Sequence, residues 1–102
     1  MRVIGTGALS NFSKKYPNCK KWIDCWLADM RGLPVPFLPL VLQRYPSVQR
    51  ENLRGLVFKF QADGVQYYMK VKVAEGTGIL TVKWVGTAVE YICYQSEENH
   101  GN

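Results

Sequence analysis

Apolar and polar side chains alternate most regularly in the second half of the chain, between residues 56 and 91. From residue 65 to residue 73 the odd-numbered positions carry valine, tyrosine or methionine, whereas the even-numbered ones carry glutamine, tyrosine or lysine. A period of two places these sets on opposite faces of a β-strand. Asp63-Gly64 and the loop 75–78 separate this strand from its neighbours. We therefore expect a three-strand antiparallel meander with one apolar and one polar face.

The first half of the chain is typical of a short strand followed by two helices. Residues 2–4 suit a strand, and Thr6 is placed to cap a helix that Pro17 ends. Asn18 is placed to cap a second helix, in which apolar side chains recur at steps of three and four residues until Gly32 stops it. The two helices form a hairpin, and we expect its apolar stripe to cover the back of the sheet.

Residues 33–42 are apolar but interrupted by prolines, so they favour either an extended cover over the core or a lead into a short helix from about Pro39 to Arg44. Residues 47–55 are polar and predict a surface loop. The expected fold is a single small α+β domain. It has a twisted antiparallel sheet, made of the N-terminal strand and the meander, with two to three helices packed on one face. The domain spans residues 1–94, and we expect residues 95–102 to be a polar, disordered C-terminal tail.

Composition excludes several classes of protein. The three cysteines lack CxxC spacing and the single histidine, His100, lies in the polar tail, so we expect no metal site and no cofactor. The odd number of cysteines indicates reduced thiols in a cytoplasmic protein. The run 33–42 is too short and too rich in proline to span a membrane. The apolar pair after Met1-Arg2 is too short for a signal peptide.

The net charge of +5 points to an acidic partner. Residues 1–50 hold eight basic and two acidic residues, so the basic excess lies mainly in the N-terminal half. A second excess lies on the meander, where every charged side chain within the strands is a lysine: Lys59, Lys70, Lys72 and Lys83. A face with clustered ammonium groups and no carboxylate suits a phosphodiester.

An ordered set of residues at fixed spacing covers the last two strands and the segment after them: Tyr67, Val71, Gly78, Val85, Gly86, Thr87, Glu90 and Tyr91. Together with the opening Met1–Ile4 and the step Tyr45-Pro46-Ser47, this set is similar to the HigB-type toxins of the RelE superfamily. The resemblance covers about residues 1–94 and places Lys72 and Lys83 where the family usually has arginines.

The resemblance implies a RelE-like fold and the role of toxin in a type II toxin–antitoxin system. Such a toxin is a metal-independent endoribonuclease (an mRNA interferase, hence a hydrolase) that cleaves messenger RNA and inhibits translation in the cytoplasm. Its expected partners are messenger RNA, the ribosome and a cognate HigA-like antitoxin that binds DNA. No association with a membrane is expected. Three departures concern the chemistry: Tyr68 stands at a family arginine, Ala88 at the family histidine and Ile92 at an acid.

RNA cleavage without a metal needs a base for the 2′-hydroxyl, cations beside the phosphorane and an acid for the leaving oxygen. Lys72 and Lys83 are our candidates for phosphate stabilisation and proton transfer, because repulsion between neighbouring ammonium groups favours a neutral lysine that acts as base. Tyr91 and Tyr68 are candidates to stack a base or donate a proton, and Glu90 is a weaker candidate base. Further RNA contacts are assigned to Lys59, Lys70, Gln66, Arg50 and Arg54.

Simpler explanations stand beside these roles. Ala88 belongs either to a natural family member with weakened catalysis or to a chain whose histidine was removed by engineering. Lysines such as Lys59 and Lys70 often serve solubility and edge protection, and Tyr91 is equally suited to anchor the C-terminal turn. Two rival functions follow. One is a non-catalytic protein that binds RNA or an acidic antitoxin segment, and the other is a protein-interaction module that uses the proline-rich segment.

Overall fold

The protein is described by a computed structural model, which gives the backbone of residues 1–100 and the side chains of residues 1–97. Helices and strands alternate along the chain, and short 3-10 turns (η) join some of them. In order, the elements are β1 (Arg2–Ile4), α1 (Thr6–Lys15), η1 (Pro17–Cys19), α2 (Lys20–Gly32), α3 (Leu38–Arg44), β2 (Gln49–Arg50), β3 (Gly55–Ala62), β4 (Val65–Ala74), η2 (Glu75–Thr77), β5 (Ile79–Thr87) and α4 (Ala88–His100).

The strands form one mixed sheet in the order β1-β5-β4-β3-β2. β3, β4 and β5 are the antiparallel meander that the sequence predicts, and β1 is the predicted N-terminal strand. Two features differ from the prediction: β1 runs parallel to β5, and the two-residue strand β2 pairs with β3 inside the expected loop. The parallel pairing is available because a long connection through helices, not a hairpin, follows β1. The fold class is α+β, as expected.

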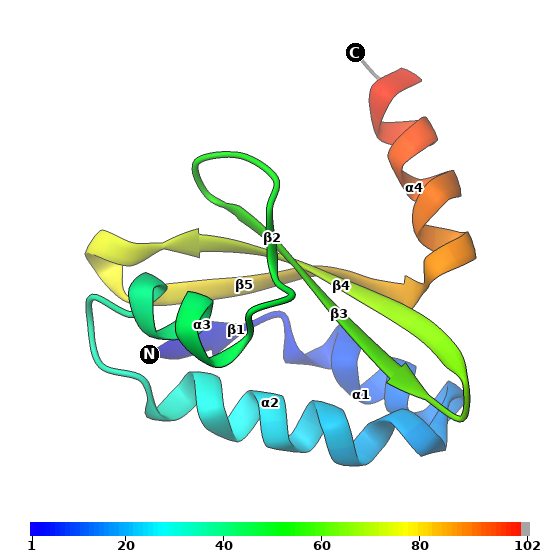
Figure 1. Ribbon diagram of the computed structural model, residues 1–102, viewed down its shortest axis with the longest axis horizontal. Coiled ribbons are helices and arrows are strands. Elements are labelled where there is room, and N and C mark those ends of the chain that lie inside the picture. The colour runs from blue at the N-terminus through cyan, green and yellow to red at the C-terminus, as the bar shows by residue number, and fades with distance from the viewer. Residues whose placement is uncertain (101–102) are drawn as a thin grey trace.

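One face of the sheet, the back face, packs against α1 and α2 (Figure 1). Each odd-numbered residue from 67 to 73 is at most 5% exposed, which confirms the predicted apolar row. Trp26 of α2 is fully buried, and its ring lies 5.3 Å from that of Phe58 on β3. Val65 is the exception in the row, since it lies beside the β3–β4 hairpin and is 43% exposed.

The two predicted helix caps are wrong, because tertiary contacts override the local signals. α1 begins at Thr6 without a side-chain cap, after Gly5 with a φ of +81°. Only glycine fits there, since an added Cβ would lie 2.7 Å from the carbonyl oxygen of Val82. Asn18 lies in η1, and its side chain donates a hydrogen bond to Asp63 in the β3–β4 hairpin at 2.8 Å. Helix α2 starts only after this turn.

The proline-rich segment combines the two predicted alternatives. Leu33 and Phe37 are buried as a cover over the core, and the short helix α3 follows. The backbone N–H of Leu38 donates to the Glu75 carboxylate at 2.8 Å, which ties the start of α3 to the β4–β5 connection. The same segment also exposes Val35 and Leu42, at 55% and 38%, so its use as a partner surface stays a prediction. Within the described part of the chain, no helix is long and apolar enough to cross a membrane.

Helix α4 is absent from the predicted fold, and it lies on the opposite side of the sheet from α1 and α2 (Figure 1). It begins with a capping box, in which the Thr87 hydroxyl accepts the N–H of Glu90 at 3.1 Å and the Glu90 carboxylate accepts the N–H of Thr87 at 2.9 Å. Once a first turn has formed, a helix can extend through polar residues. The helix therefore includes residues 95–100, where we expected a disordered tail, whereas 101–102 lie outside the described residues.

Candidate nucleic-acid interface

The front face of the sheet, opposite α1 and α2, carries most of the candidate residues. Strand register fixes their neighbours: Lys70 of β4 lies opposite Val57 of β3 and Trp84 of β5, and Tyr68 lies opposite Lys59. The even-numbered row of β4 thus forms the polar face that the alternation predicts. Its lysines lie beside aromatic rings, a combination that suits both phosphates and bases.

A β-bulge gives Lys83 a special position. The register passes from Lys70 opposite Trp84 to Val71 opposite Val82, so Lys83 has no partner on β4. Strict alternation would place Trp84 on the back face with Val82, but the extra residue returns it to the front face beside Lys70. Bulges of this kind bend a strand and re-aim its side chains, often next to functional sites. Sequence pattern alone does not reveal this bulge.

Three lysines, Lys70, Lys72 and Lys83, line one open hollow of about 210 Å³, which we call the lysine hollow. Lys72 and Lys83 are exposed, and neither ammonium has a carboxylate of residues 1–97 within ion-pair distance. Positive charge is therefore concentrated in a concave surface that fits an anion. The other lining residues are Asn52, Gly55, Val71 and Tyr94.

The third lysine, Lys70, has a partner that the sequence did not indicate. Glu51, in the loop after β2, places Oε2 3.3 Å from Lys70 Nζ, and its Oε1 accepts a hydrogen bond from the Tyr91 hydroxyl at 3.2 Å. Gln95, one turn later on α4, donates to the same hydroxyl at 3.3 Å. Tyr91 is 6% exposed and packs against Tyr68, with ring centroids 5.0 Å apart. These contacts match the anchoring role considered for Tyr91, because they fasten α4 to the sheet.

A second hollow on the front face, of about 310 Å³, contains Ala88, and we call it the Ala88 hollow. The Lys59 ammonium lies 5.5 Å from the centroid of the Tyr68 ring, a cation–π contact at its wall. Glu51 lines the Ala88 hollow, and its ion-pair partner Lys70 lines the lysine hollow. The two hollows are therefore connected by this ion pair. The remaining lining residues are Gln49, Val57, Tyr91, Ile92 and Gln95.

The predicted site residues therefore converge only in part. Lys72 and Lys83 meet in the lysine hollow, whereas Tyr91 lines the Ala88 hollow and is nearly buried. The tyrosine that does line the lysine hollow is Tyr94, a residue that sequence reasoning missed. Tyr94 follows Tyr91 by three residues, and without knowledge of α4 there was no signal that it turns toward the lysines.

The segment 86–90 of the family-like motif has structural tasks. An added Cβ at Gly86 would lie 2.7 Å from Cη2 of Trp84, so the indole lies directly across this glycine. Thr87 and Glu90 form the capping box of α4. Glu90 lines a hollow beside α1 and not the lysine hollow. The pattern Thr-x-x-Glu is a sequence signal for a helix start, and it could have predicted α4.

The remaining candidates lie away from the lysine hollow. Arg50 and Arg54 line another hollow of about 460 Å³ beside η2. The Arg50 guanidinium donates to the Leu53 carbonyl at 3.1 Å. Gln66 lies near the β3–β4 hairpin, opposite Gln61, and lines neither the lysine hollow nor the Ala88 hollow.

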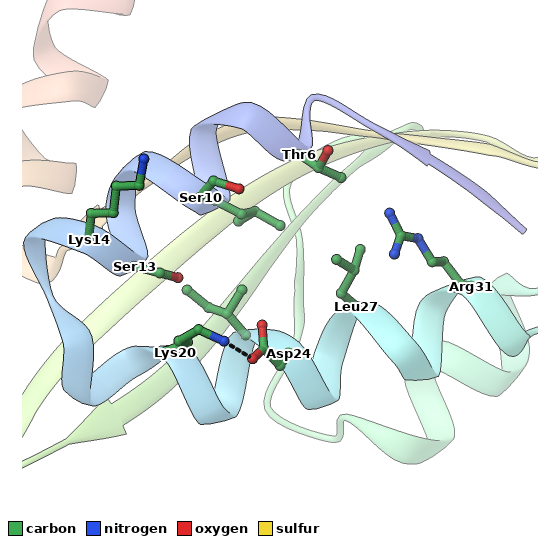
Figure 2. Close-up of a pocket in the computed structure, with 10 residues that line it drawn as sticks. Thr6, Ser10, Ser13, Lys14, Lys20, Asp24, Leu27 and Arg31 are labelled. Carbon is green, nitrogen blue, oxygen red and sulfur yellow. Dashed lines mark hydrogen bonds and ion pairs between the residues drawn. The ribbon is translucent and has the colours of Figure 1, made fainter.

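A groove of about 410 Å³ lies between α1 and α2, and we call it the helix groove (Figure 2). Leu9 and Ile23 are buried beneath it, and cationic side chains stand along it. Lys20 pairs with Asp24 at 2.6 Å, whereas Lys14 and Arg31 have no ion-pair partner among residues 1–97. The groove therefore contains part of the basic excess of the N-terminal half.

A scan against protein-family models and a search of curated proteins find no match to this chain. Among the described residues, no group of three or more His, Cys, Asp or Glu side chains is placed to hold a metal ion. Fold and site geometry alone define the class. It is a small α+β domain with helices on both sides of a mixed sheet and a lysine-lined hollow on the front face.

Proposed function

We propose that the protein is the toxin of a type II toxin–antitoxin system, with a RelE-like fold, and that it cleaves messenger RNA in the cytoplasm during translation without a metal ion. The lysine hollow carries this proposal, because Lys72 and Lys83 bring positive charge into one concave surface without an ion-pair partner among residues 1–97. The order of residues 67–91, which resembles the HigB-type toxins, supports RNA as the anion.

In the proposed reaction a 2′-oxygen attacks the adjacent phosphorus, and the bond from phosphorus to the next 5′-oxygen breaks. The products are a 2′,3′-cyclic phosphate and a 5′-hydroxyl. Lys72 and Lys83 stabilise the charge on the phosphorane, and one of them is our candidate to take the proton of the 2′-hydroxyl. Tyr94 also lines this hollow, and its hydroxyl is our candidate to donate a proton to the leaving 5′-oxygen.

Ala88 makes this activity weak in our proposal. Its methyl group brings no titratable group into the Ala88 hollow. Glu90 and Tyr91, the other candidates of that motif, are engaged in the capping box and in the contact with Glu51. Loss of a general acid or base typically costs about a hundred- to ten-thousand-fold in rate. We therefore expect slow cleavage that depends on the lysines.

The test compares Lys72→Ala and Lys83→Ala with the unsubstituted chain in a translation reaction, with cleavage mapped by primer extension. We expect each substitution to lower the rate about a hundred-fold or more, as the loss of one preorganised cation or donor typically does. Lys21→Ala is the matched control, because Lys21 is exposed on α2 and lines neither front-face hollow. Equal cleavage by all four proteins would remove the lysine hollow from the mechanism.

The second candidate function is a non-catalytic protein that holds RNA on the same face. It is favoured by the structural engagement of Glu90 and Tyr91, which leaves the cleavage chemistry to lysines and Tyr94. Ala88→His separates the candidates. A weakened enzyme gains cleavage and growth arrest from the histidine, whereas a pure binder keeps RNA intact with either residue at position 88.

We further propose that the cognate antitoxin, a HigA-like protein, binds the helix groove through an acidic segment. Lys14 and Arg31 supply charge without an ion-pair partner among residues 1–97, and the apolar floor accepts a side chain from the partner. Charge reversal by Arg31→Glu tests this, with co-purification of the protein encoded beside this chain as the measurement. Undiminished co-purification of Arg31→Glu, with Lys21→Glu as control, would place the partner elsewhere.

A further inference from the structure

We propose that the RNA path does not end in the lysine hollow but continues around the bulge at Lys83 to a second backbone-binding site beside α1. In this site Lys15 holds a further phosphate of the same single strand. The inference rests on the proposed binding of RNA to the front face. It adds a subsite that determines how long a strand the protein grips.

The first observation is that Lys83 lines two hollows. One is the lysine hollow, and the other is a hollow of about 310 Å³ that we call the α1 hollow. Because the bulge leaves Lys83 outside the regular pairing of β4 and β5, its side chain serves both. The α1 hollow is also lined by Lys15, Tyr16, Trp84 and Glu90.

The second observation is that β1 pairs with only the first part of β5. β1 pairs with β5 only from Ile79 to Thr81, and Thr81 is the partner of Ile4, the last residue of β1. Beyond Thr81 no further strand of residues 1–100 flanks β5 on that side, and the chain turns at Gly5 into α1. A strand of RNA that leaves the lysine hollow at Lys83 therefore meets α1 and not a wall of sheet.

The third observation is the chemistry of the α1 hollow. The Lys15 ammonium is exposed and lies 5.5 Å from the centroid of the Tyr16 ring, and the half-buried Trp84 lines the same hollow. Cations that follow the backbone, together with aromatic rings that stack bases, are the usual design of sites for single-stranded nucleic acid. α1 contains no acidic residue, and it ends in two lysines.

One carboxylate, that of Glu90, lines this hollow, and its negative charge would repel a phosphate unless it is offset. Its Oε1 accepts the backbone N–H of Thr87 at 2.9 Å, at the start of α4. The positive end of a helix offsets a negative charge placed there. The net field of the α1 hollow is therefore set by Lys15 and Lys83, and it attracts phosphate.

The test measures binding of single-stranded RNA by fluorescence anisotropy with a short and a long oligonucleotide, of about 4 and about 12 residues, which both lie within the range of common site sizes. The RNA carries 2′-O-methyl groups so that no cleavage intervenes. We expect Lys15→Ala to weaken binding of the long RNA and to reduce the slope of log K against log salt by about 0.7, the value for one phosphate contact in a single strand. Binding of the short RNA stays unchanged, because the lysine hollow suffices for it.

Lys21→Ala provides the matched control, since Lys21 is exposed on α2 and does not line the α1 hollow. A Lys15→Ala protein that binds long RNA with the natural slope overturns the second subsite, and so does an equal loss in Lys21→Ala. In either case the front-face function stands. A natural chain that binds neither RNA overturns the proposed function together with this inference. Urea unfolding midpoints confirm that each variant folds.

Discussion

At the scale of single residues, one indole ring organises the front face. Trp84 lies across Gly86 and stacks on Tyr94, with ring centroids 5.1 Å apart and ring planes inclined by 22°. The ring of Tyr91 also contacts the indole of Trp84, with ring centroids 5.5 Å apart. Tyr94 thus reaches the lysine hollow because Trp84 holds it there. The glycine before Thr87 is required by this packing and need not touch RNA.

This packing predicts the effect of adding one methyl group. Gly86→Ala should destabilise the fold by about 1–3 kcal/mol, the usual cost of overpacking, because the new Cβ would lie 2.7 Å from the indole. Gly76→Ala is the control, since an added Cβ at Gly76 meets nothing within 4 Å. Urea unfolding measures both. Equal stability of the two variants would mean that the indole moves aside without cost.

A second residue-scale prediction concerns alkaline pH. Burial, followed by the hydrogen bond with Asp29 and the charge of Asp29, raises the pKa of Tyr45 well above its ordinary value of 10.0. The unfolded chain therefore loses this proton first, and the contribution of Tyr45 to stability falls as the pH rises above about 10. Tyr45→Phe should make the urea midpoint decline less steeply between about pH 9 and about pH 11. Parallel pH profiles of the two proteins would contradict this account.

At the scale of elements, the meander could be predicted because its strands show alternating apolar and polar residues and are separated by recognisable turn sequences. The Asp63-Gly64 hairpin has positive φ at both residues, 51° and 77°, as that turn chemistry requires. β2 could not be predicted, because two residues are too few to show a period. The bulge at Lys83 and the capping of α1 depend on contacts between distant segments, which no local pattern contains.

Helix α4 allows structural and catalytic roles of its first turn to be separated. Glutamine also completes a capping box, so Glu90→Gln should keep both the stability and the cleavage rate if Glu90 is only a cap. Thr87→Ala should cost about 1 kcal/mol in the unfolding free energy. Both variants are measured by urea unfolding and by the cleavage assay. A large loss of cleavage in a stable Glu90→Gln protein would restore Glu90 as the base.

At the scale of the whole molecule, two basic surfaces lie on opposite sides of the sheet. The lysine hollow opens on the front face, and the helix groove lies in the layer of α1 and α2 (Figure 2). This separation would let an RNA and an acidic protein segment bind at the same time. Lys72 and Lys83 could be predicted for the site because they belong to one strand meander. Glu51 could not, because it meets Tyr91 across 40 positions of sequence.

Thiol reactivity reports on the stability of the whole molecule. Cys25 and Cys93 are exposed, whereas Cys19 is fully buried, and burial raises the pKa of its thiol. We expect iodoacetamide to label two cysteines rapidly under native conditions and the third only as fast as the core opens. Mass spectrometry of the labelled peptides gives the order. Rapid labelling of Cys19 would show that α1 and η1 open independently of the sheet.

The extra residue at position 83 makes one segment of β5 longer than the part of β4 that it accompanies. Excision of that residue would join Val82 to Trp84 and restore unbroken alternation along β5. Every other side chain of the strand would stay on its present face of the sheet. Shortening a strand by one residue ordinarily turns half of it inside out. Here we expect the shortened chain to fold normally and to lose only the ammonium group of Lys83. The cation that lines both hollows is therefore also the residue whose removal disturbs the sheet least.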